Sequence, residues 1–60
     1  MSHGAERQRI ADTVTWLIGL YGPDAATEAL HHAFKRERAG DRTAAQFFIE
    51  VYRVIAERRA

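Results

Sequence analysis

The sequence predicts an all-α protein, with three short helices over about residues 5–21, 23–39 and 42–58 that form a small bundle completed by dimerisation. Three observations support this class. Apolar residues recur with the period of an α-helix, glycine interrupts them at two interior places, and alternation of apolar with polar residues never lasts for four residues. We expect one helical domain over residues 1–60, with residues 1–4 disordered.

The first predicted helix carries large apolar residues on one stripe. They follow the i, i+4, i+7, i+8, i+11 spacing of a helix face and are Ile10, Val14, Leu17, Ile18 and Tyr21. Gly22 follows directly and suits the left-handed conformation that ends many helices. Pro23 and Asp24 suit the first turn of the next helix, because proline lacks an N–H that this turn leaves unbonded and a carboxylate complements the helix dipole.

Smaller side chains form the stripe of the second predicted helix, which consists of Ala26, Ala29, Leu30, Ala33 and Phe34. Gly40 is expected to end this helix. Asp41 is a suitable N-cap for the third helix, and Thr43 with Gln46 three residues later is a rival capping box. The third stripe consists of Phe48, Val51, Tyr52 and Ile55.

The large apolar side chains are unevenly distributed among the predicted helices. Seven lie in the first helix, seven in the third, and only Leu30 and Phe34 in the second. Each outer helix is apolar over about 200°, whereas a single core requires a face of about 100°. Either a compact monomer tolerates exposed apolar residues, as most proteins do, or the surplus contacts another chain.

We favour the second interpretation and predict a homodimer, with another protein as the alternative partner. The stripes described above account for the residues that one core would bury. The apolar residues left partly exposed are the predicted interface: Trp16, Leu20, Phe47 and Val54.

The composition excludes several classes of protein. The chain has no cysteine, which rules out disulfides, cysteine-ligated zinc, iron–sulfur clusters and thiol nucleophiles. The apolar stretch at residues 16–21 is far shorter than the roughly 20 residues of a membrane span, and no signal-peptide pattern precedes it. We therefore expect a cytoplasmic protein without membrane contact.

No group of residues predicts catalysis, a cofactor or a metal site. His31 and His32 follow Glu28 at i+3 and i+4, but the two imidazoles lie about 100° apart on a helix and cannot readily chelate one ion. A chain of this length is also expected to lack a pocket of several hundred cubic ångströms unless subunits share one. The sequence favours a protein that is not an enzyme.

A basic cluster provides an alternative function. Lys35, Arg36, Arg38 and Arg42 are close in sequence, which is compatible with a small regulator that binds DNA or RNA. However, nine Lys and Arg residues against eight Asp and Glu residues give a net charge of only +1. The first three of these side chains also have the sign that a helix C-terminus favours. We therefore predict mainly a protein-interaction module that self-associates.

The chain from Gly22 onward resembles a set of very short, mostly alphaproteobacterial, all-helical proteins of unknown function. The shared pattern is a glycine, alanines on one helical face, a Gly-Asp turn, and an aromatic residue followed by aliphatic ones. It reads here as Gly22, Ala25, Ala26, Ala29, Ala33, Ala39-Gly40-Asp41, Ala45, Phe48, Val51 and Ile55. The resemblance implies the same helix boundaries and no particular activity.

Overall fold

A computed structural model describes the backbone of residues 2–59 and the side chains of residues 4–58, and its secondary structure is entirely helical. The elements are α1 (Ser2–Tyr21), the short 3-10 helix η1 (Gly22–Asp24), α2 (Ala25–Arg38) and α3 (Arg42–Arg59). Helical backbone therefore runs in two stretches, 2–38 and 42–59, and η1 divides the first stretch into α1 and α2. The predicted all-α class is confirmed.

The boundaries correct the sequence prediction in two places. α1 begins at Ser2, before the predicted start at about residue 5, while Met1 lies outside the described residues. Pro23 lies in η1, and α2 begins only at Ala25. The predicted break between the first two helices is thus a tighter helical turn, because the chain changes from i→i+4 to i→i+3 hydrogen bonding there.

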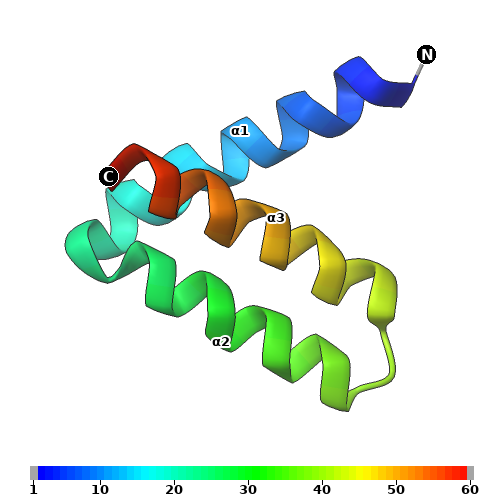
Figure 1. Ribbon diagram of the computed structural model, residues 1–60. Coiled ribbons are helices and arrows are strands. Elements are labelled where there is room, and N and C mark those ends of the chain that lie inside the picture. The colour runs from blue at the N-terminus through cyan, green and yellow to red at the C-terminus, as the bar shows by residue number, and fades with distance from the viewer. Residues whose placement is uncertain (1, 60) are drawn as a thin grey trace.

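The helices form a small bundle with one projecting end (Figure 1). α2 and α3 lie side by side and antiparallel, and theirs is the most extensive contact between helices. The C-terminal half of α1 packs on this pair, whereas its N-terminal end extends beyond the pair. The apolar stripe of α1 therefore meets the other helices over only part of its length.

The core consists of a few branched side chains above a layer of alanine. Val14 and Leu17 of α1 are fully buried together with Val51 and Ile55 of α3. α2 adds small side chains to this cluster: Ala25, Ala26 and Ala29. Because alanine projects little from the backbone, α2 can approach its neighbours closely while burying little apolar area. The predicted small-residue face of α2 is confirmed.

Three residues of the predicted stripes remain exposed instead of entering this core. Ile18 and Tyr21 are 37% and 38% exposed, and Phe34 is 60% exposed. His32 stacks on Phe48 of α3 with ring centroids 4.9 Å apart, so that side of α2 faces α3. Phe34 lies about 200° further round the helix and therefore points away from α3.

The turn between α2 and α3 is fixed by a Schellman motif. The Gly40 N–H donates to the Glu37 carbonyl at 3.1 Å, and the Asp41 N–H donates to the Arg36 carbonyl at 2.9 Å. Gly40 has φ of 82°, a left-handed conformation that disfavours residues with a Cβ. Gly22, with φ of 56°, ends α1 in the same region. Both predicted glycine stops are confirmed.

Asp41 is the N-cap of α3. Its Oδ1 accepts a hydrogen bond from the Ala44 N–H at 3.1 Å, and its carbonyl accepts one from the Ala45 N–H at 3.0 Å. Thr43 lies inside α3, so the rival capping box is not the start of this helix. Asp24 occupies the corresponding position of α2 but makes no side-chain capping bond.

The two aspartates provide a matched test of this turn. We expect Asp41→Ala to lower the free energy of unfolding by about 1 kcal/mol, because it leaves the Ala44 N–H without its capping acceptor. Asp24→Ala should cost only a few tenths of a kcal/mol, since it removes only a favourable charge near the dipole of α2. Urea denaturation followed by circular dichroism measures both. Equal losses in the two variants would contradict this assignment.

Candidate protein-interaction surface

The fold divides the four predicted contact residues into two pairs. Phe47 and Val54 are half-buried and pack against the core cluster. Phe47 meets Phe48 edge to face, with centroids 5.4 Å apart and an interplanar angle of 86°. The guanidinium carbon of Arg9 on α1 lies 5.5 Å from the centroid of the Phe47 ring. Phe47 thus helps to join α1 to α3.

Trp16 and Leu20 remain exposed on α1. Trp16 is 56% exposed and Leu20 is 57% exposed, and the two lie one helical turn apart. Neither belongs to the core cluster or to the partly buried residues that pack against it. Of the four residues predicted as an interface, these two form a continuous surface on one helix.

Helical geometry places Gly19 at the centre of this surface. At 100° per residue, Ile10, Val14 and Leu17 have a common direction toward the core, and Gly19 points about 170° away from it. Trp16 and Leu20 lie on one side of Gly19, and Ile18 lies on the other. We call these residues the outer patch: Trp16, Ile18, Gly19 and Leu20. Neither Ile18 nor Gly19 is among the contact residues predicted from the sequence.

The outer patch covers only the C-terminal half of α1. Toward the N-terminus, the same side of the helix carries Gln8 and Asp12, whose side chains are joined by a 2.9 Å hydrogen bond. Polar groups therefore bound the patch along the helix. An apolar area with a polar border is typical of a surface that contacts another macromolecule.

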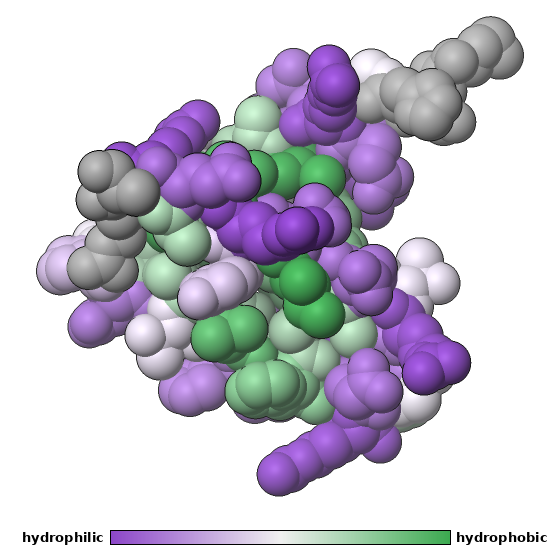
Figure 2. Space-filling model, in the orientation of Figure 1, coloured by the Kyte–Doolittle hydropathy of each residue, from purple (hydrophilic) through white to green (hydrophobic). Residues whose placement is uncertain are grey.

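The chain exposes more surface than a compact monomer of its mass. Its accessible surface is 4574 Å², whereas a compact monomer of its mass exposes about 4,000 Å². The excess of about 600 Å² reflects the open arrangement of the helices. The projecting end of α1 contributes to the excess (Figure 1), and apolar side chains reach the surface between charged ones (Figure 2).

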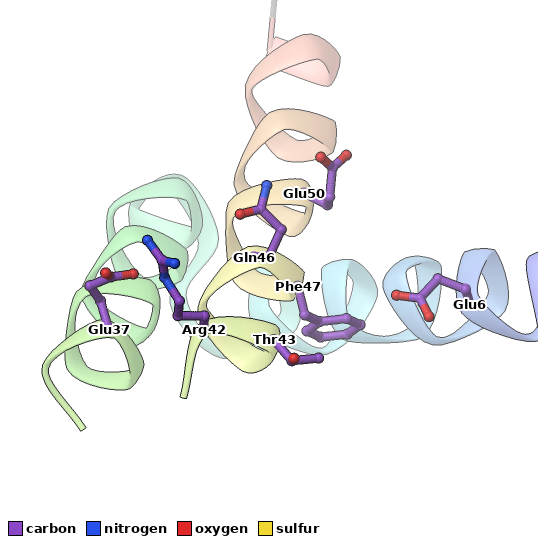
Figure 3. Close-up of a pocket in the computed structure, with 7 residues that line it drawn as sticks. All are labelled: Glu6, Glu37, Arg42, Thr43, Gln46, Phe47 and Glu50. Carbon is purple, nitrogen blue, oxygen red and sulfur yellow. The ribbon is translucent and has the colours of Figure 1, made fainter. Parts of the chain in front are cut away.

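An open groove separates the N-terminal part of α1 from the start of α3. Its volume is about 540 Å³ and it is lined by Glu6, Glu37, Arg42, Thr43, Gln46, Phe47 and Glu50 (Figure 3). The expectation that the chain is too short for such a volume was wrong, because diverging helices leave space outside the core. The acidic side chains come from three separate helices, and within residues 4–58 no group of three His, Cys, Asp or Glu residues could hold a metal ion.

The histidine pair diverges, as its spacing predicted. The Nδ1 atom of His31 lies 3.9 Å from Oε2 of Glu28, whereas the ring of His32 stacks on Phe48. The two imidazoles thus face different neighbours. His32 has a packing role between α2 and α3.

The basic cluster lies at the turn between α2 and α3. Lys35, Arg36 and Arg38 occupy the last turn of α2, and Arg42 is the first residue of α3. All four side chains are exposed. The positions of the first three suit the negative end of the α2 dipole, which accounts for their charge within the fold.

Comparisons with protein-family models, with curated proteins and with solved structures found no match for this chain. The resemblance to short alphaproteobacterial proteins therefore stays a prediction. Over the described part of the chain, none of the helices combines the length and the apolar character that crossing a bilayer requires.

Alanine substitutions distinguish the two pairs of predicted contact residues. We expect Phe47→Ala to lower the free energy of unfolding by about 2 kcal/mol, because it removes a half-buried ring from the joint between α1 and α3. Trp16→Ala should change the stability of the monomer by less than about 0.5 kcal/mol. Denaturation followed by circular dichroism at about 1 μM, where association contributes least, measures both. A larger loss for Trp16→Ala would place that ring in the core.

Proposed function

We propose that this protein is a small, non-catalytic helical module that functions by self-association, with α1 supplying the contact between two copies. One observation carries the proposal: Trp16 and Leu20 are more than half exposed although the core beneath them is already filled by Val14 and Leu17. Neither side chain packs against the core of the single chain. A second copy that covers them accounts for their presence.

The energetics support a dimer that forms without other partners. Covering the exposed parts of Trp16, Leu20 and Ile18 at about 25 cal/mol per Å² contributes several kcal/mol per subunit before the entropic cost of association. Among the side chains that the structure describes, four large ones are fully buried: Leu17, Ile55, Val14 and Val51. A core of this size gives a small domain modest stability, so the contact adds substantially to it.

The charge of the chain is compatible with this association. The net charge of +1 gives little long-range repulsion between two copies. A cytoplasmic location forms part of the same proposal, because a cysteine-free chain needs no oxidising compartment to fold.

Sedimentation equilibrium tests the proposal directly. At tens of micromolar, we expect a mass about twice the 6.8 kDa of one chain. Trp16 is the single tryptophan, so its emission should shift to shorter wavelength as rising concentration fills the interface. A mass near 6.8 kDa, with Trp16 emitting as indole does in water, would refute self-association.

Two matched variants locate the contact. Trp16→Glu should give a folded monomer, because a carboxylate at the interface would have to lose its hydration. Phe34→Glu is the control, since Phe34 is an equally exposed aromatic residue on α2, outside the outer patch. This control should remain dimeric. Loss of the dimer in Phe34→Glu alone would move the contact from α1 to α2.

A further inference from the structure

Gly19 has no explanation within a single chain. A glycine inside a helix is less favourable than alanine, because glycine loses more backbone freedom on folding. Among the described residues, only Gly22 and Gly40 have positive φ, so the backbone at Gly19 does not require a glycine. A Cβ built on Gly19 would meet no atom within 4 Å, so packing within the chain does not require it either.

The position of Gly19 differs from that of an ordinary surface residue. It points directly away from the core, and the exposed side chains of Ile18 and Leu20 lie about 100° to either side of it. The missing Cβ leaves a notch that Trp16 borders on one side and Thr15, one helical turn earlier, borders on the other. Backbone is therefore accessible at the centre of the outer patch, where another chain can approach most closely.

We infer that Gly19 is the point of closest approach between two copies of α1, which cross there about a two-fold axis. This inference rests on the proposed self-association and assigns its geometry. The absence of a side chain lets the helix axes approach to the lower end of the 8–10 Å range of packed helices, about 8 Å. Trp16 of each chain then packs beside the notch of the other chain.

The occupant is a second copy because the outer patch is complementary to itself. It contains both a large projecting ring, Trp16, and a recess three residues later, Gly19. A two-fold axis brings the same surface of both chains together, so each ring can meet the opposite recess. The exposed parts of Trp16, Leu20 and Ile18 are the apolar surface that the second copy covers.

Gly19→Ala tests the inference, because the monomer and the dimer predict opposite effects. In an isolated chain, alanine should strengthen α1 and raise the thermal midpoint at low concentration. In the crossed dimer, the added methyl groups separate the helices and should raise the dissociation constant about tenfold or more. Gly4→Ala is the control, since Gly4 also lies in α1, has no neighbour within 4 Å of a built Cβ, and is outside the outer patch. Its dissociation constant should equal that of the unmodified protein.

A cross-linking measurement gives an independent readout. The chain has no cysteine, so Gly19→Cys introduces a single thiol. At the crossing point the two Cα atoms should come within the roughly 7 Å that a disulfide spans, and mild oxidation should trap a covalent dimer. Gly4→Cys should not cross-link under the same conditions.

The possible results separate this inference from the proposed function. A dimeric wild-type protein whose Gly19→Ala variant associates equally well or more tightly would overturn the crossing at Gly19 and leave self-association standing. Failure of Gly19→Cys to cross-link, at concentrations where sedimentation shows a dimer, would do the same. A wild-type protein that remains monomeric would overturn both.

Discussion

Val14 and Leu17 on α1 share one buried cluster with Val51 and Ile55 on α3, and the arrangement of the helices depends on keeping these four side chains out of water. None of the other large apolar side chains that the structure describes is buried. α2 therefore acts as a layer of alanine beneath the cluster, and its close approach compensates for the small area that each alanine buries. The position of α2 follows from packing, since its own side chains supply little hydrophobic driving force.

The same constraint explains the surface. A helix that directs Val14 and Leu17 inward directs Trp16, about 130° away, outward and leaves Leu20, about 90° away, on its flank. Trp16 and Leu20 are consequently exposed by the geometry that completes the core. The outer patch thus comprises the outer face and both flanks of the helix that holds the core together. Any contact made through it would couple association to the stability of the fold.

Local chemistry predicted the helix ends well, because each signal acts within a few residues. Gly40 and Asp41 required no tertiary information: a left-handed glycine followed by a capping aspartate ends one helix and begins the next. At Gly22 the stop was correctly located, but the turn after it was not, since Pro23 fits a 3-10 turn as well as the first turn of an α-helix.

The sequence by itself determined the helical class, the turn residues and the surplus of apolar side chains, because periodicity and turn chemistry are properties of neighbouring residues. Only the tertiary structure decided how that surplus is divided. Phe47 is drawn against the core by the crossing of α1 and α3, whereas Trp16 stays exposed, although both lie at the edge of an apolar stripe. The difference arises because Phe47 lies where α1 meets α3, whereas Trp16 lies on the side of α1 that faces away from both other helices.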